Sequence, residues 1–117
     1  MNPEEQAALQ KIKALVANHP VVIFMKGTLD EPKCGFSMTA AEILKSLAVP
    51  IMAVDVLEDP EIRKAAKKYA DWPTFPQVYV DGELVGGCDI TLELQANGEL
   101  EKMVKGVADK WPADTAE

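Results

Sequence analysis

Apolar side chains along this chain alternate between helical and strand-like spacing. Residues 4–18 repeat apolar positions at intervals of three and four, which is the spacing of one buried helix face. Residues 21–25 form a continuous, β-branched apolar run, the pattern of a strand buried on both faces. A polar loop over 27–33 leads into a second helical pattern over 36–48. The beginning of the chain therefore predicts a helix, a buried strand and another helix.

The remainder of the chain continues the alternation and adds a hairpin. The helical patterns lie at residues 60–70, 89–96 and 99–109, and the strand-like runs at 51–56, 77–80 and 83–86. Asp81-Gly82 joins the last two runs, and Asp-Gly between two strand-like runs is a strong hairpin signal. The predicted order is α-β-α-β-α-β-β-α-α.

This order of elements predicts an α/β fold. The first half is a β-α-β unit, which requires parallel strands joined by a right-handed crossover, and the hairpin adds antiparallel strands. We therefore expect a four-stranded mixed sheet flanked by helices on both faces. Because no linker or internal repeat is visible, we expect one domain over residues 1–110 and a flexible tail over 111–117.

Composition and charge exclude several classes of function. The chain has 117 residues, 48% of them apolar, and a net charge of −7. This charge argues against nucleic-acid binding, which needs a clustered cationic surface; the run Arg63-Lys64 with Lys67-Lys68 has helical spacing and indicates a solvated helix face. No apolar run is long enough to span a membrane, and the acidic N-terminus is unlike a signal peptide. With two distant cysteines, we expect a cytoplasmic protein.

The candidate chemistry centres on Cys34, in the run Cys34-Gly35-Phe36-Ser37. It directly precedes a predicted helix, where unpaired N–H groups and the helix dipole lower a thiol pKa, and Lys26 and Lys33 add positive charge. We therefore predict an exposed, reactive thiol; the alternative is a buried cysteine that acts as a small apolar residue.

Ser37 stands where a C-x-x-C redox motif would have its second cysteine. A disulfide within the motif is therefore impossible, and Cys34 is left to form a mixed disulfide with a small thiol or to bind a soft metal. Ser37 itself either makes a local hydrogen bond to the first helical turn or takes part in the chemistry.

Four blocks of sequence together resemble the monothiol glutaredoxins of the CGFS type, in their single-domain bacterial or organellar form. The blocks are Lys26-Gly27, Cys34-Gly35-Phe36-Ser37, Trp72-Pro73-Thr74-Phe75-Pro76-Gln77 and Gly86-Gly87-Cys88-Asp89. The similarity runs from about residue 5 to residue 109 and implies a thioredoxin fold. Lys33 departs from the family, which often has a small residue directly before the cysteine.

The resemblance implies a glutathione site beside a catalytic Cys34. Lys26 and Arg63 would hold the glycyl carboxylate of glutathione, and Asp89 its γ-glutamyl amine. The implied glutathione-binding set is Lys26, Arg63, Thr74, Phe75, Pro76, Gly87, Cys88 and Asp89. Within it, Pro76 is expected to follow a cis peptide bond. The alternatives are a solvated face for Arg63, a plain helix cap for Asp89 and a purely structural role for Phe75.

Two functions from different classes fit this site. The first is carriage of a [2Fe–2S] cluster, which normally has four thiolate ligands. Cys34 as a metal ligand from each of two chains, with two glutathione thiols, would complete the set in a homodimer that returns to monomers when the cluster leaves. The family is associated with transfer to acceptor proteins and with BolA-like partners. The second is glutathione-dependent thiol–disulfide exchange, for which the resemblance implies weak activity. A redox-inert interaction module is the third alternative; we favour the carrier.

Overall fold

The computed structural model describes residues 2–47 and 49–110, and its helices and strands follow the predicted order. The elements are α1 (Pro3–Asn18), β1 (Val21–Met25), α2 (Gly35–Lys45), β2 (Ile51–Asp55), α3 (Pro60–Ala70), β3 (Gln77–Val80), β4 (Glu83–Gly86), α4 (Cys88–Ala96) and α5 (Glu99–Lys110). The predicted tail, residues 111–117, lies outside the described residues.

The four strands form one mixed sheet in the order β2-β1-β3-β4, which confirms the predicted architecture. The central strand β1 pairs parallel with β2 and antiparallel with β3, and β3 pairs antiparallel with β4. The hairpin between β3 and β4 turns at Asp81 and Gly82, whose φ angles of 52° and 81° are left-handed. Such a pair of positive φ angles matches the twist of the two strands it joins.

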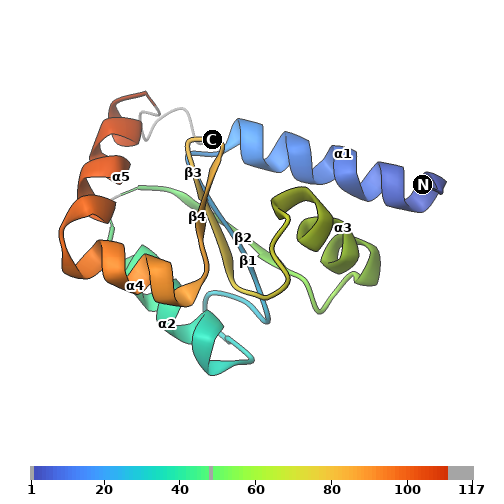
Figure 1. Cartoon of the computed structure of the whole chain (residues 1–117), viewed down its shortest axis with the longest axis horizontal. Coiled ribbons are helices and arrows are strands. Elements are labelled where there is room, and N and C mark those ends of the chain that lie inside the picture. The colour runs from blue at the N-terminus through green and yellow to red at the C-terminus, as the bar shows by residue number, and fades with distance from the viewer. Residues whose placement is uncertain (1, 48, 111–117) are drawn as a thin grey trace.

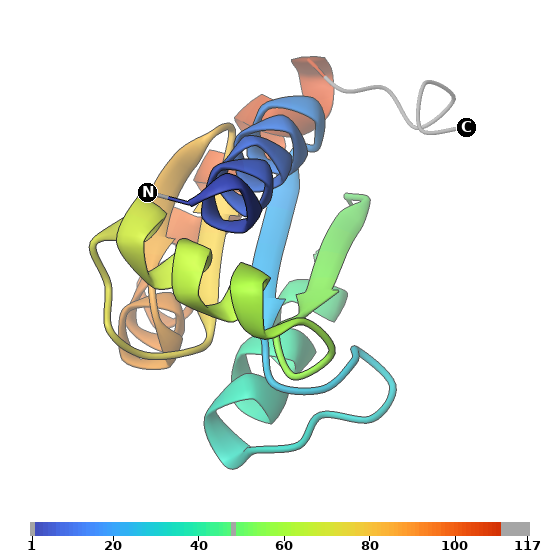
Figure 2. The ribbon, with the colours of Figure 1, turned by 90° about the vertical axis from the view of Figure 1, so that its right-hand side faces the viewer.

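Helices cover both faces of the sheet, as Figures 1 and 2 show. On one face, α1 and α3 pack against alternate residues of β1, Val22 and Phe24. On the other face, α2 and α5 pack against Val21, Ile23 and Met25. Every residue of β1 is therefore buried, which explains why its sequence is apolar without alternation. No described helix is long and apolar enough to cross a membrane.

Five helix boundaries differ from the prediction, four of them by one residue and the end of α2 by three. The second helix ends at Lys45 instead of residue 48, because Ser46 turns back onto Ile43. The N–H and the hydroxyl of Ser46 both donate to the Ile43 carbonyl, at 3.2 and 2.6 Å, and this tightens the last turn. Helix α4 begins at Cys88, one residue earlier than predicted, so Cys88 belongs to its first turn.

The strand directions bring three segments to one end of the sheet. Strands β1 and β4 both end there and β3 begins there, because β3 is antiparallel to its two neighbours. The side chain of Asp55 at the end of β2 ties this end together: its Oδ1 accepts the N–H groups of Gly27 and Leu57, each at 2.9 Å. The loop after β1, the loop before β3 and the start of α4 thus lie side by side.

Candidate functional site

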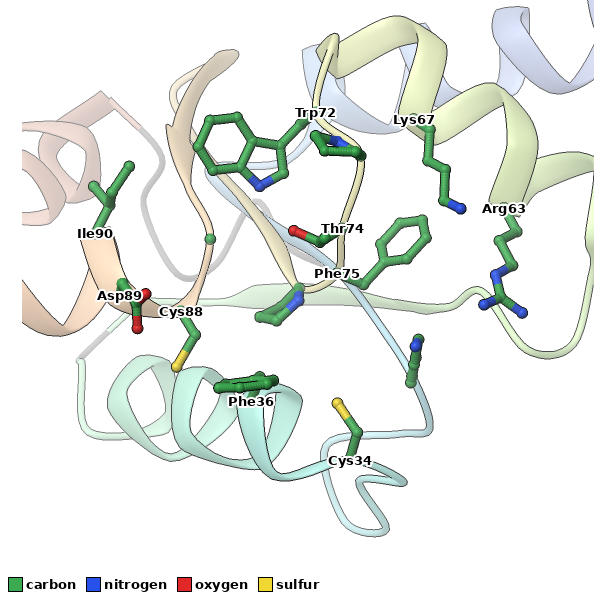
Figure 3. Close-up of a pocket in the computed structure, with 14 residues that line it drawn as sticks. Cys34, Phe36, Arg63, Lys67, Trp72, Thr74, Phe75, Cys88, Asp89 and Ile90 are labelled. Carbon is green, nitrogen blue, oxygen red and sulfur yellow. The ribbon is translucent and has the colours of Figure 1, made fainter.

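A pocket of about 540 Å³ lies at this end of the sheet, next to Cys34 (Figure 3). Its lining comprises Lys26, Cys34, Phe36, Arg63, Lys67, Trp72, Pro73, Thr74, Phe75, Pro76, Gly87, Cys88, Asp89 and Ile90. All nine residues that the sequence singled out therefore meet in one place. The volume is in the range typical of sites for small molecules.

Cys34 is the N-cap of α2. Its extended backbone (φ −147°, ψ 154°) turns the sulfur back over the first helical turn, where Sγ accepts the Ser37 N–H at 3.4 Å. This position brings an anionic sulfur close to unpaired N–H groups of the helix start. The side chain is half-buried, so the thiol is less exposed than the sequence suggested, although it still faces the pocket.

Ser37 connects the thiol to the end of β1. Its side chain is fully buried, and its hydroxyl oxygen accepts the Lys26 N–H at 3.1 Å. The same hydroxyl is hydrogen-bonded to Cys34 Sγ at 3.4 Å. Because the oxygen already accepts from Lys26, its own proton is free to point at a thiolate. The Ser37 hydroxyl therefore bonds to the backbone just after β1 and to the reactive sulfur, and not to the first helical turn as the first of the two alternatives had it.

These contacts make Cys34 more acidic than an ordinary cysteine. Partial burial by itself raises the pKa of Cys34, but the Ser37 hydroxyl, the N–H groups of Ser37 and Phe36, and the Lys26 charge together lower it by more. The pKa therefore lies below its usual value, and the thiolate is favoured. Lys33, predicted to contribute, is instead exposed and paired with Glu31 at 3.6 Å, and it is not among the groups that lower this pKa.

The second cysteine, Cys88, lies across the pocket in the first turn of α4, and its pKa is shifted in the opposite direction. Partial burial, the Asp89 carboxylate and the Cys34 sulfur all raise its pKa. Two thiols that face the same cavity thus differ in ionisation, and Cys34 is the one favoured as a thiolate. The side chain of Cys88 is half-buried.

Charge is divided between the two ends of the pocket. Arg63 and Lys67 lie at one end and Asp89 lies at the other (Figure 3), and Lys26 also lines the pocket. Within the described parts of the chain, none of these four forms an ion pair. Lys67, which sequence reasoning missed, lies one helical turn after Arg63 and holds its ammonium 5.9 Å from the centroid of the Phe75 ring. Its spacing of four from Arg63 was the available signal.

Free backbone groups line the wall between the charged ends. The Phe75–Pro76 peptide bond is cis, as predicted, and no hydrogen bond among the described residues uses the backbone of Phe75. Gly87, the N-cap of α4, has no side-chain cap, so N–H groups of the first turn stay available. A Cβ at Gly87 would lie 3.3 Å from both Pro76 O and Trp72 Nε1, so a side chain at this position would be crowded. This wall can pair with an extended peptide and with a carboxylate.

The arrangement of a helix-capping thiol, a cis-proline loop and a charged pocket on this sheet defines a thioredoxin-fold protein of the glutaredoxin class. A family model described as Glutaredoxin matches residues 21–85. Glutaredoxin 4 of Pasteurella multocida is 50% identical over 106 residues, covering 91% of this chain and 97% of that protein. The ycf64-like monothiol glutaredoxin of Synechocystis is 51% identical, covering 90% and 95% of the two chains.

Solved structures agree with this assignment. The solution structure of reduced poplar apo GrxS14 is 50% identical, has a TM-score of 0.74 and covers 84% of this chain and 90% of that one. A buckwheat glutaredoxin–glutathione complex, 24% identical, shares the fold with a TM-score of 0.81, covering 92% of this chain and 96% of that one. The chain belongs to the monothiol glutaredoxin family.

Proposed function

We propose that this protein is a carrier of [2Fe–2S] clusters that depends on glutathione. Two copies would hold one cluster, each through Cys34 and through the thiol of a glutathione in its pocket, and would pass it to acceptor proteins. The site itself is the observation that supports the proposal. Cys34 has a lowered pKa and no second cysteine in its motif, and it borders a pocket with opposite charges at its two ends.

The pocket has the complementary groups that glutathione requires. Glutathione is an extended tripeptide with a carboxylate at each end, an amine and a central thiol. Lys26, Arg63 and Lys67 suit the glycyl carboxylate, and Asp89 suits the γ-glutamyl amine. The N–H groups at the start of α4 suit the second carboxylate, and the unpaired Phe75 backbone suits the middle of the peptide. In this orientation the ligand thiol lies toward Cys34.

The supply of thiols supports a cluster shared between two chains. A [2Fe–2S] cluster needs four ligands, and this chain has two cysteines, of which Cys88 has a raised pKa. Over residues 2–47 and 49–110, no group of three or more metal-ligating side chains exists. Two copies of Cys34 and two glutathione thiols make four, so the dimer would exist while the cluster is bound.

Delivery of the cluster requires a surface that acceptors can reach. Phe36 lines the pocket and is 66% exposed, and Met38, two residues further along α2, is 51% exposed, so apolar surface is available next to Cys34. Acceptor proteins and a BolA-like protein are the proposed partners at this surface, and the proposed location is the cytoplasm. Apolar side chains at an exposed surface favour contact with another protein.

Glutathione-dependent disulfide exchange is a second candidate, supported by the lowered pKa of Cys34. The Cys34 thiolate would attack the glutathione sulfur of a protein–glutathione disulfide, forming a Cys34–glutathione disulfide and releasing the protein thiolate. A second glutathione thiolate would then attack the glutathione sulfur of that disulfide and restore Cys34 with release of oxidised glutathione. Ser37 has no thiol to take this second step, so turnover depends on glutathione from solution.

Anaerobic reconstitution tests the carrier. Protein supplied with iron, sulfide and glutathione should become coloured and elute as a dimer, and omission of glutathione should prevent both changes. Cys34→Ser should abolish the cluster, whereas the matched variant Cys88→Ser should mostly retain it. Cluster binding that is equal without glutathione would refute the shared-ligand proposal. Fast turnover in a glutathione-coupled disulfide assay, with no cluster bound, would favour the oxidoreductase.

A further inference from the structure

Gln77 is a buried polar residue outside the pocket. It is the first residue of β3, its exposure is 0%, and it is not part of the pocket lining. Its Nε2 group donates two hydrogen bonds, to the carbonyl oxygens of Trp72 at 3.0 Å and of Thr74 at 3.2 Å. One side-chain amide therefore uses both of its protons on the loop that forms the pocket wall.

The loop that Gln77 contacts has few other hydrogen bonds. Pro73 and Pro76 have no N–H group, and the backbone of Phe75 has no partner within the described part of the chain. Over residues 73–76, the Thr74 carbonyl is thus the one described backbone group with a hydrogen bond, and its donor is Gln77. The side chain of Gln77 consequently sets where this segment lies relative to the sheet.

An amide at this position has a cost that an apolar side chain would avoid. Gln77 Oε1 is buried and has no hydrogen-bond partner among the described residues. Burial of an unpaired carbonyl is unfavourable, so methionine, which is similar in length and shape, would fill the same space without this penalty. Methionine would however lose the two hydrogen bonds to the Trp72 and Thr74 carbonyls, so what glutamine specifically contributes is the attachment of the loop.

We infer that Gln77 is a positioning residue for glutathione, which acts by holding the Trp72–Thr74 segment so that the Phe75 backbone can pair with the ligand beside Cys34. The inference rests on the proposed function for the glutathione site, and it adds a residue that does not touch the ligand. The free Phe75 backbone and the cations on α3 can bind one ligand together only if the loop keeps a fixed position relative to β3.

The test is Gln77→Met, with S-methylglutathione as the probe because it cannot form a disulfide. We expect calorimetry on reduced apo protein to show a dissociation constant raised about tenfold. The unfolding temperature should change little, because relief of the unpaired Gln77 Oε1 offsets the loss of two hydrogen bonds to part-buried carbonyls. The NMR order parameters of the Thr74 and Phe75 N–H bonds should fall, because the loop becomes more mobile. The pH profile of Cys34 alkylation by iodoacetamide should not move, because the groups that lower its pKa are on α2 and at Lys26, directly after β1.

Two further variants make the result decisive. Tyr79→Phe removes another unpartnered buried polar atom from the same strand, one that makes no hydrogen bond to the loop, and should bind the probe as the wild type does. Gln77→Asn keeps an amide that is one methylene too short to reach both carbonyls, and should weaken binding even if Gln77→Met does not fold. Unchanged binding together with unchanged order parameters of the Thr74 and Phe75 N–H bonds, in either folded Gln77 variant, would overturn the inference.

The outcomes for Gln77 and for the proposed function are separable. Wild-type protein that binds the probe but never a cluster would refute the carrier and leave the Gln77 result interpretable. Wild-type protein that binds neither would refute the proposed function. In that case the order parameters of the Thr74 and Phe75 N–H bonds still decide whether Gln77 holds the loop.

Discussion

Replacement of Ser37 by alanine tests the electrostatic account of the reactive thiol. The Ser37 hydroxyl is hydrogen-bonded to Cys34 Sγ at 3.4 Å and accepts a hydrogen bond from the Lys26 N–H at 3.1 Å. Ser37→Ala removes the first bond and leaves the Lys26 N–H without an acceptor in the interior. Two separate effects should follow, one on the acidity of Cys34 and one on the stability of the fold.

The size of each effect follows from the hydrogen bond that is lost. A hydrogen bond to a charged group contributes about 1.5–3 kcal/mol, and the long contact to a half-buried sulfur belongs at the lower end. About 1.5 kcal/mol corresponds to a roughly tenfold smaller fraction of thiolate at a pH below the pKa. The buried, unpaired N–H of Lys26 should lower the free energy of unfolding by about 1–3 kcal/mol.

The assay is the rate of alkylation by iodoacetamide across a range of pH, in a Cys88→Ser background so that one thiol reacts. Thiolate is the nucleophile, and lowering its pKa extends reactivity toward lower pH. Because Ser37→Ala raises the pKa of Cys34 relative to the wild type, its profile should move to higher pH. The two rates should approach each other at high pH, where both thiols are ionised.

Thr39→Val is the matched control. The Thr39 hydroxyl lies on the same helix but donates to the Gly35 carbonyl at 3.1 Å, away from the sulfur. Its removal should leave the alkylation profile unchanged. If Ser37→Ala and Thr39→Val gave the same profile as the parent, the Ser37 hydroxyl would have no effect on Cys34, and the reasoning would be refuted.

Three further predictions concern stability. Gly27→Ala should destabilise strongly and disrupt the loop before Cys34, because φ is +95° and a Cβ would lie 2.4 Å from Glu31 O; thermal unfolding checks this. Gly106→Ala, in an exposed turn of α5 with no atom within 4 Å of the new Cβ, should instead stabilise by about 0.5–1 kcal/mol in the same assay. Burial raises the pKa of Tyr79 from 10.0 to about 12, so the neutral phenol stabilises the folded state fully below pH 10 and this contribution is lost as pH rises toward 12. Denaturant titrations should show a loss of about 3 kcal/mol over that interval that is absent in Tyr79→Phe; equal slopes would contradict it.

Most of the fold could be predicted from local patterns in the sequence. Strand β1 is apolar at every position because both of its faces are covered, and this could be read without knowing the covering helices. The end of α2 could not be predicted, since helical periodicity continues past Lys45, where the hydrogen bonds of Ser46 stop the helix. A competing local hydrogen bond leaves little trace in hydrophobic spacing.

Some residues of the site could likewise be predicted from the local sequence, whereas the roles of others depend on the tertiary structure. Cys34 at a helix start is a local signal, whereas the basic run on α3 was misread as one solvated face. The helix separates that run: Lys64 and Lys68 pair with acids, at 3.9 Å and 3.3 Å, while Arg63 and Lys67 reach the pocket. Gln77 belongs to one of the resembling blocks, but no local pattern indicates its role, because that role depends on a loop that folds back onto its amide.

The glutathione content of the cluster-bound dimer tests the central claim most directly. Protein reconstituted anaerobically, isolated as a dimer and then denatured by acid should release two glutathione molecules for each pair of iron atoms. Lys26→Ala and Arg63→Ala together should reduce both glutathione and iron, because the glycyl carboxylate would lose its cations. A stable coloured dimer that contains iron and sulfide but no glutathione would contradict the account, since Cys34 would then share the cluster with ligands other than those proposed here.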